Sequence, residues 1–445
     1  MQDPVLFLLF IISRFWWIIL PIVLFFPLKV LYFHWVRWDV WYKKHKWILL
    51  EVKTPKEILK PFKAMENVFN MLWGFYDGAN WRERWCEGEL PTTPYWFSCE
   101  IVSLGGKVHF YFRILEEWRN TIESAFYSQF PDIEISLAED YTQKIPQDVP
   151  NKEWDLYAED YTQMRDYLYP IKTYPTFFEP QGERIAQEEK RIDAMDSLLE
   201  GLSKIRSDER FWVQIVVNPI TNKDIPFITR GKALIDKLAN RPEKPKPKPM
   251  LLEAADILVS GEPPGGLKES KEFIPPEMKL TPGEREMLMA VSNKISKFNF
   301  KVWMRMVHLY KRDLPAPRLS TKLVRNYLNQ FNTQDMNGFV YWGATRTRIH
   351  YFLPKRRLYF RKRRLFRLYC QRLPSTFPRS MEGKLPLYRR LPILEIGYKG
   401  PGIGGIMVLN SEELATIFHF PSKVIIPSIP YVEAKKGGPP PALPT

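Results

Sequence analysis

Tyr95-Trp-Phe-Ser-Cys-Glu-Ile-Val-Ser-Leu-Gly-Gly-Lys-Val-His-Phe-Tyr-Phe-Arg-Ile114 is the stretch that decides the fold. Apolar and polar side chains alternate from Tyr95 to Ser103 and again from Lys107 to Ile114, as in half-buried β-strands. Gly105 and Gly106 stand between the two runs, and such a pair is typical of a tight hairpin turn. The sequence therefore predicts an antiparallel β-hairpin.

Further elements are predicted on both sides of this hairpin. Trp47 to Val52 is a short apolar run typical of a strand, and Pro61 to Trp73 carries apolar residues at helical spacing. Glu116 to Phe130 is predicted to be a second helix, and Ile133 to Ala138 a last strand. The order β-α-β-β-α-β is the ferredoxin-like plan, which we expect for residues 47–140.

A second, looser copy of this plan is predicted over residues 141–345. Thr281 followed by Glu284 has the spacing of a capping box, which marks a helix start. Residues 241–279 are rich in Pro, Lys and Glu and are predicted to be a mobile insertion in this unit. The expected strands are Tyr167 to Phe178, Phe211 to Pro219 and Asn299 to Tyr310, and the expected helices are Glu183 to Arg206, Thr281 to Ser296 and Leu319 to Phe331.

The first 46 residues predict a membrane anchor and a juxtamembrane segment. No charged residue occurs from Phe15 to Leu28, and extension to Trp35 gives the roughly 20 residues that a helix needs to cross the hydrocarbon core. Trp16, Trp17, Trp35 and Trp38 are the candidate anchor residues, and Trp35 and Trp38, with Trp41 and Tyr42, would form an aromatic belt at the membrane interface. The alternative is a re-entrant hairpin in which residues 4–13 also insert.

The direction of this anchor follows from its flanks. Arg37, Lys43, Lys44 and Lys46 follow the apolar run, whereas Arg14 alone precedes it. The positive-inside rule then places the C-terminal bulk in the cytoplasm. The predicted fold class is α+β, with an N-terminal transmembrane helix followed by tandem ferredoxin-like units, and the predicted location is the cytoplasmic (inner) membrane in a single pass. Residues 346–431 are expected to form a basic and aromatic C-terminal region, and 432–445 a Pro-rich tail.

The composition favours an anionic partner. The chain has 65 basic and 50 acidic residues, a formal net charge of +15. This excess suits nucleic acid or the anionic face of a membrane. The three cysteines, Cys86, Cys99 and Cys370, lack the spacing of a zinc site, and we expect buried, reduced thiols.

No catalytic motif was found in the sequence. The glycine-rich stretch Gly397 to Gly405 lacks the Lys-Ser/Thr pair of a P-loop and is interpreted as a flexible turn. His419 stands among aromatic residues and is interpreted as a packed, hydrogen-bonded histidine. Glu412 and Glu413 follow Asn410 and Ser411, either of which could cap a helix. We therefore predict no enzyme, no catalytic residue, no cofactor and no metal.

The strongest chemical signal is a run of basic residues without an acid between Lys355 and Arg372. Arginine that binds phosphate, beside rings that stack on bases, is typical of non-specific nucleic-acid binding. Anionic lipid head groups or an acidic protein surface would suit the same charges, and a solvated face over a packed core would explain them without a ligand. The candidate polyanion ligands are Lys355, Arg356, Arg357, Arg361, Lys362, Arg363, Arg364, Arg367 and Arg372, and the candidate stacking rings are Tyr359, Phe360, Phe366 and Tyr369.

Three stretches add a family resemblance: residues 47–66, Gln330 to Phe339, and Val408 to Pro421 followed by 433–444. Together with the Trp-rich N-terminus they resemble an uncharacterised family of membrane proteins from candidate-phyla bacteria, which is associated with conjugation-like (type IV secretion) ATPases. In that family the similar region precedes a P-loop motor domain. The resemblance implies a P-loop ATPase partner, on another chain or in a further C-terminal domain.

The resulting hypothesis is a non-enzymatic membrane-anchoring and assembly component of a type IV secretion-like or DNA-transfer apparatus, which docks an ATPase at the cytoplasmic face. Its expected partners are the lipid bilayer, that ATPase, nucleic acid and further copies of the chain. One alternative is a membrane-tethered, non-specific nucleic-acid-binding protein that uses the basic run. Another is an envelope or pilus scaffold.

Overall fold

The computed structural model of the 445-residue chain describes most residues between His45 and Val432. Short helical pieces nearer the N-terminus, at 13–18, 20–21, 24–25, 28 and 32, are described as well. The main described ranges are 45–58, 61–78, 96–177, 193–239, 241, 280–313, 320–343, 345–349, 353–373, 407–423 and 428–432.

The predicted hairpin is present. Strands β2 (Phe97–Leu104) and β3 (Lys107–Leu115) pair in antiparallel register along their length. Gly105 and Gly106 in the turn have positive φ angles of 61° and 90°, which residues with a side chain rarely adopt. A Cβ atom on Gly105 would also lie 2.7 Å from the carbonyl oxygen of Ser207, so this turn requires glycine.

The first half of the sheet is completed by β1 (Trp47–Pro55) and β4 (Glu134–Ala138), with helices α3 (Pro61–Leu72) and α5 (Arg119–Gln129). β1 lies between β3 and β4 and is antiparallel to both, which gives the order β4-β1-β3-β2. Helix α3 starts at a proline, a residue well suited to the first turn. Its buried side recurs at helical spacing, through Phe62, Met65, Val68, Phe69 and Leu72.

The second half repeats this connectivity, and its strands lie in the order β6-β7-β5-β8. β7 is the longest strand, and twelve of its thirteen residues are buried. Every strand pair in this half is antiparallel. The elements are β5 (Trp154–Gln163), α6 (Ala194–Ser203), β6 (Arg210–Ile220), β7 (Asn299–Lys311), α10 (Ser320–Asn329) and β8 (Phe339–Tyr341).

Two predictions for this half need correction. The strand expected over Tyr167 to Phe178 is wrong, because the strand is β5 at Trp154–Gln163 and the described residues 167–177 form turns and the short 3-10 helix Tyr174–Thr176. β5 contains three carboxylates, which obscured its strand pattern; the structure buries Glu159 and Asp160 beside arginines. The helix expected over Glu183 to Arg206 is described only as α6, and residues 178–192 lie outside the described part.

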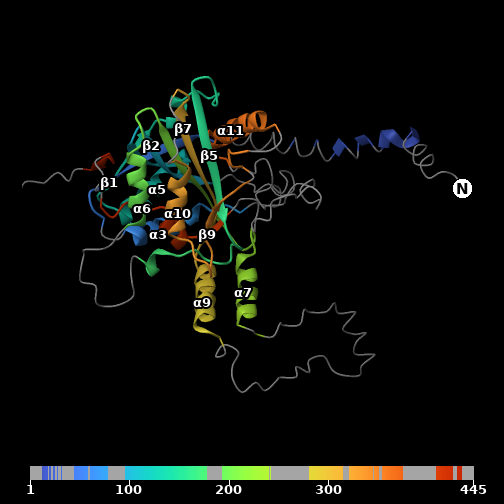
Figure 1. Ribbon diagram of the computed structural model, residues 1–445. Helices are drawn as coiled ribbons and strands as arrows, with labels where there is room; N and C mark the ends of the chain where they lie inside the picture. The colour runs from blue at the N-terminus through green and yellow to red at the C-terminus, as the bar shows by residue number, and fades with distance from the viewer. Residues whose placement is uncertain are drawn as a thin grey trace, which may run out of the picture.

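The two halves share one sheet instead of standing as separate units. β2 pairs antiparallel with β6 along eight residue pairs, and this contact joins the halves into one ten-stranded sheet. The fold is α+β, with the helices packed on this sheet (Figure 1). β10 (Tyr431–Val432) pairs in parallel with the end of β1. The fold class predicted two ferredoxin-like units in tandem. The structure instead joins them through one continuous sheet, with a hydrophobic core that extends across both halves.

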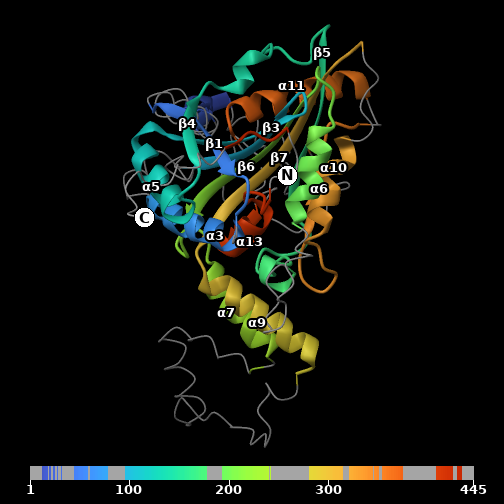
Figure 2. The same cartoon turned by 90° about the vertical axis from the view of Figure 1, so that its left-hand side faces the viewer.

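The sheet has two differently covered faces. One face carries α3, α5, α6 and α10 over the largest hydrophobic cluster. The opposite face is covered by helix α11 (Pro354–Cys370) and by the segment around Tyr141. Figure 2 shows α11 and α10 on either side of β5.

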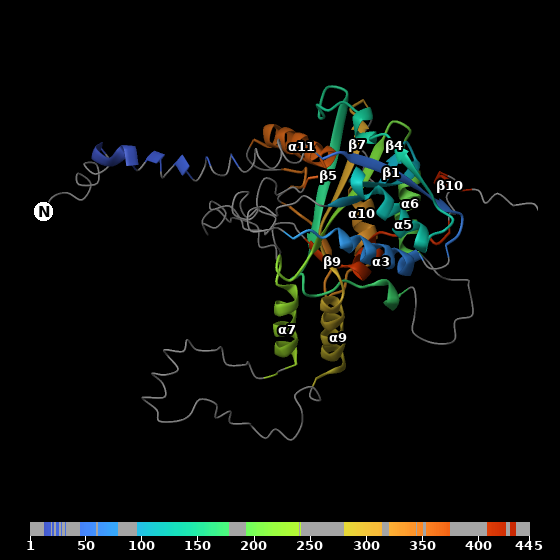
Figure 3. The same ribbon diagram turned by 180° about the vertical axis from the view of Figure 1, so that it is seen from behind.

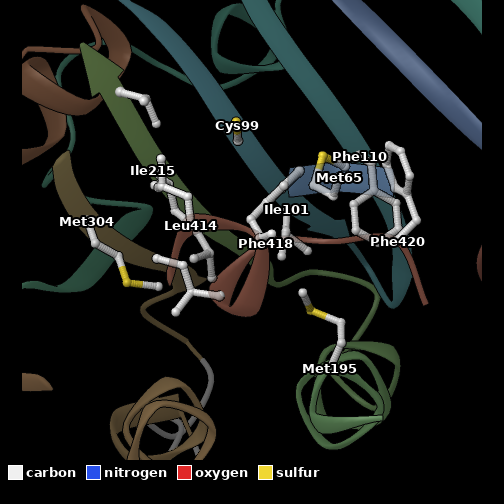
Figure 4. Packing of buried hydrophobic residues seen from close by; sticks show 14 of the residues in the cluster. Met65, Cys99, Ile101, Phe110, Met195, Ile215, Met304, Leu414, Phe418 and Phe420 are labelled. Carbon is white, nitrogen blue, oxygen red and sulfur yellow. The ribbon is translucent and has the colours of Figure 1, made fainter. Parts of the chain in front are cut away.

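The C-terminal segment forms the centre of the helix-covered face. β9 (Met407–Asn410) pairs with the start of β7, and α13 (Ser411–Ile417) packs on α3 of the first half. Asn410 caps α13 in a capping box with Glu413, which selects between the two caps left open by the sequence. Figure 4 shows Leu414, Phe418 and Phe420 directed at the sheet.

Two helices project from the sheet as an arm, α7 (Phe227–Leu238) and α9 (Pro282–Ser296), as the rear view in Figure 3 shows. The arm is inserted between β6 and β7, where the first half has the tight Gly105-Gly106 turn. The predicted capping box of Thr281 and Glu284 starts α9. Of the predicted insertion 241–279, only Arg241 lies within the described residues.

The membrane anchor must be corrected. Within the described part of the chain, no helix combines the length and the apolar character that a membrane crossing requires. This finding contradicts the transmembrane helix over Phe15 to Trp35 and, with it, the single-pass inner-membrane location. Trp16 and Trp17 are exposed, and Trp35 and Trp38 lie outside the described residues.

Candidate functional site

Most of the predicted basic run folds into a single helix, α11. Pro354 occupies the first turn, where its missing N–H is not needed, and the 17 residues contain neither glycine nor a β-branched side chain. The helix presents an apolar side to the sheet through Leu365 and Phe366, which pack in the cluster that contains Trp212. Its other side faces outward, so the nine basic residues have different surroundings.

Two of the four proposed stacking rings belong to the core. Phe366 is 1% exposed and Tyr369 is fully buried. Their ring centroids lie 6.3 Å and 5.2 Å from that of Trp212, both in stacked geometry. The apolar side of α11 needs these rings to cover the sheet, so the prediction that they stack on bases is corrected. Tyr359 and Phe360 are exposed, by 38% and 56%.

Arg372 is an internal residue at the end of the run. Its guanidinium is 1% exposed and forms ion pairs with Glu100 at 3.0 Å and Asp140 at 2.6 Å. Burial disfavours the charge on Glu100, yet the Arg372 guanidinium and the Tyr141 hydroxyl hold the pKa of that carboxyl below its usual value. Arg372 therefore holds the end of α11 on the sheet, and its assignment as a polyanion ligand is corrected.

Two other basic residues connect α11 to its neighbours. Lys362, 9% exposed, forms an ion pair of 2.6 Å with Asp155 on β5. Arg361 donates from Nη1 to the carbonyl oxygen of Arg346 at 2.8 Å. Both contacts orient the helix against the edge of the sheet, and Lys362 has little surface left for a ligand.

Five basic residues of α11 are exposed and gather on one side. Counted from Arg356, the ring of Phe360 and the basic residues Arg363, Arg364 and Arg367 follow at four, seven, eight and eleven residues, which is one face of a helix; Lys355 precedes them in the first turn. Arg363 donates to the Tyr359 hydroxyl at 2.8 Å, and Arg356 lies 5.9 Å from the centre of the Phe360 ring. We define the α11 basic face as Lys355, Arg356, Arg363, Arg364 and Arg367 with the rings Tyr359 and Phe360; Arg357 is half-buried beside it.

Of the groups considered for chemistry in the described part of the chain, His419 and Cys99 are buried and Cys370 is half-buried. His419 is fully buried, with Nε2 2.7 Å from the Asp193 carboxylate and Nδ1 3.1 Å from the carbonyl oxygen of Ala415. Burial raises the pKa of the Cys370 thiol to about 12. No three His, Cys, Asp or Glu residues are placed to hold a metal ion within the described ranges. Cys86 and the stretch Gly397 to Gly405 lie outside the described residues.

Sequence reasoning missed a charged and aromatic cluster at the edge of the second half. Glu159 on β5 is fully buried and accepts from both Arg325 on α10 and Arg346 beyond β8. Both guanidiniums also lie over the ring of Tyr341, at 4.2 Å and 4.6 Å from its centre. No local sequence motif predicts this cluster, because its residues come from three separate parts of the chain.

Comparison of the chain with protein-family models and with curated proteins finds no match. The resemblance to the membrane-protein family associated with conjugation-like ATPases therefore stays a prediction. The site has to be interpreted from its own chemistry.

Proposed function

We propose that this protein is a non-enzymatic nucleic-acid-binding protein whose α11 basic face holds the phosphate backbone. The proposal is carried by one observation, a helix with five exposed basic residues and no acid, fixed to the sheet by its opposite side. Phosphates repeat regularly along a nucleic acid, so a row of Lys and Arg binds them without reading the base sequence.

The charges of α11 divide into two groups. Lys362 and Arg372 are neutralised by carboxylates of the sheet and hold the helix in place. Among the described residues, no carboxylate forms an ion pair with Lys355, Arg363 or Arg367. These charges are presented on a rigid element, so a polyanion that binds them does not first have to break an ion pair with a carboxylate.

Nucleic acid is favoured over anionic lipid by the two exposed rings. Tyr359 and Phe360 stand among the exposed arginines, and their ring planes cross at 74°. Bases stack on such rings, and each stacked base contributes about 1–3 kcal/mol to binding. A lipid head group offers charge but no base, so it gives these rings no stacking partner.

The secretion-like assembly role and the ATPase partner remain predictions of the resemblance. They are compatible with a nucleic-acid-binding component and need their own test. Recovery of a P-loop ATPase with the full-length chain at high salt would support them.

The first test replaces four exposed basic residues of the face by glutamine: Lys355, Arg356, Arg363 and Arg367. Binding of a fluorescein-labelled oligonucleotide is measured by anisotropy over a range of salt concentrations. We expect weaker binding at low salt and a plot of log K against log salt that is less steep by about 3, because each lost phosphate contact removes 0.7–0.9 from the slope.

The matched control replaces four exposed basic residues of the α7–α9 arm and its base: Lys223, Lys232, Lys237 and Arg285. It removes the same charge far from α11 and should leave the slope nearly unchanged. Equal losses in both variants would reduce the effect to net charge and contradict a specific face. Equal binding of phosphatidylserine vesicles and oligonucleotide, unaffected by Tyr359→Ala and Phe360→Ala, would favour a lipid surface instead.

A further inference from the structure

The cluster around Glu159 has an excess of positive charge, because two arginines pair with a single carboxylate. One carboxylate, fully buried, serves two guanidiniums: Arg346 Nε lies 2.9 Å from Oε1, and Arg325 Nε donates to Oε2 at 2.9 Å. Two like charges held at one carboxylate repel each other, and a bound anion would relieve that repulsion. The side chains of Arg325 and Arg346 keep 26% and 18% of their surface exposed.

Arg346 is oriented as an arginine that binds a phosphate would be. It contacts Glu159 and the Tyr157 hydroxyl through Nε, at 2.9 Å and 3.3 Å. Within the described part of the chain, neither of its Nη atoms has a hydrogen-bond partner. Arg325 likewise uses Nε and Nη2 and has no such partner for Nη1. A guanidinium fixed by Nε and presenting its paired Nη donors matches the geometry of bidentate phosphate recognition.

A ring lies directly beside these donors. Tyr341, at the end of β8, is 37% exposed, and both guanidiniums contact its ring. The backbone after it is held along β5, since Trp342 N donates to Asp160 O at 2.7 Å and Thr347 N to Ala158 O at 3.2 Å. Ring and donors are therefore held in place before a ligand arrives.

The cluster adjoins the α11 basic face. Arg361 of α11 donates to the carbonyl oxygen of Arg346, so the two sites meet at the sheet edge. α11 covers one face of β5, whereas α10, the helix that carries Arg325, covers the other (Figure 2). A chain bound along α11 would reach Arg346 by turning around this edge.

We propose that Arg346, with Nη1 of Arg325, binds a phosphate of the nucleic acid and that the adjacent base or sugar packs on Tyr341. This second site rests on the proposed function of α11 and extends its ligand around the β5 edge. A single-stranded oligonucleotide is the appropriate probe, because a duplex has a persistence length of about 150 base pairs and resists so tight a turn.

The test combines photocrosslinking with two substitutions. In the wild-type chain, an oligonucleotide that contains 4-thiothymidine should crosslink to peptides from both α11 and the segment around Tyr341. Arg346→Lys keeps the charge at Glu159 but loses the paired donors, and Tyr341→Ala removes the ring. Each should weaken oligonucleotide binding about fivefold, the equivalent of about 1 kcal/mol. Arg285→Lys on α9 and Tyr127→Ala on α5, both exposed, are the matched controls.

The outcomes separate this site from the proposed function. Crosslinks confined to α11, with both variants binding as the wild type does, would overturn the second site and leave the α11 basic face as the binding site. A wild-type chain that binds no oligonucleotide would overturn both. If Arg346→Lys weakens binding of thymidine monophosphate but leaves oligonucleotide affinity unchanged, the site binds a small phosphate compound. The proposal that one nucleic-acid chain extends from α11 to Arg346 is then wrong. Thermal unfolding of each variant excludes a folding defect, and the wild-type crosslink does not depend on the variants.

Discussion

Single residues in this protein obtain their role from their partners more than from their type. Arg367 and Arg372 belong to the same basic run, yet the first is exposed and the second is fully buried between two carboxylates. The difference matters because removal of one partner from a buried pair costs about 3–5 kcal/mol, whereas an exposed charge contributes little. Substitutions that probe binding must therefore be chosen from the exposed group.

Asp196 provides a test of stability against pH at the residue scale. Burial, with the nearby Asp193 carboxylate adding to it, raises the pKa of Asp196 to about 6, from an ordinary value of 3.8. The folded state thus holds this proton more tightly than the unfolded chain. The resulting stabilisation is complete below pH 4 and is lost as the pH rises through 6.

At pH 8, Asp196→Asn should therefore raise the free energy of unfolding by about 1–2 kcal/mol over the wild type, which is seen as a higher midpoint in urea. The gain should shrink as the pH falls below 6. Asp208→Asn, at a carboxylate that is 53% exposed, is the control for the loss of a surface carboxylate. A gain that is the same at pH 5 and pH 8 would contradict the raised pKa.

At the scale of elements, α13 joins parts of the chain that are remote in sequence. Glu413 accepts from the backbone N–H of Ile171 and pairs with the buried Lys294 of α9, and Phe420 packs on Phe110 of β3. α13 and the residues that follow it, through Phe420, thus contribute to both halves of the core. This explains why a short C-terminal segment is buried along almost its whole length.

Leu414→Ala should destabilise the protein by about 2–5 kcal/mol, because Leu414 is fully buried and its removal leaves a cavity in the shared core. Leu137→Ala on β4, where the leucine is 60% exposed, should cost little. Urea unfolding followed by circular dichroism compares the two. Similar midpoints for both variants would show that α13 is dispensable for the core.

For the whole molecule, the continuous sheet predicts cooperative behaviour. β2 and β6 pair through eight residue pairs, and the main hydrophobic cluster includes residues of both halves. Neither half can unfold without exposing the edge strand and the core surface of the other. The two ferredoxin-like halves should therefore act as one folding unit.

Scanning calorimetry should show a single transition in which the calorimetric enthalpy equals the van't Hoff enthalpy. Two separated transitions would mean that the halves are independent in spite of their shared sheet. A chain with Leu414→Ala makes the comparison sharper, since it should lower the temperature of the one transition without splitting it.

The sequence by itself determined the local features. The Gly105-Gly106 hairpin, the helix that starts at Pro61 and the capping box at Thr281 occur as predicted, and Asn410 is one of the two caps that the sequence left open. Each depends on residues within about four positions of one another, through turn geometry, helical periodicity or a side chain that caps its own helix. The nine basic residues were found in the same way, as a run in the chain.

Only the tertiary structure decided which of these residues are available and what joins the elements. The partners Arg372 and Glu100 are 272 residues apart, and Arg325 and Glu159 are 166 apart. The pairing of β2 with β6, the central position of α13 and the absence of a membrane-crossing helix in the described residues were likewise not readable from local patterns. Periodicity reports which face of an element is apolar, whereas the element that covers that face is selected by packing among all of them.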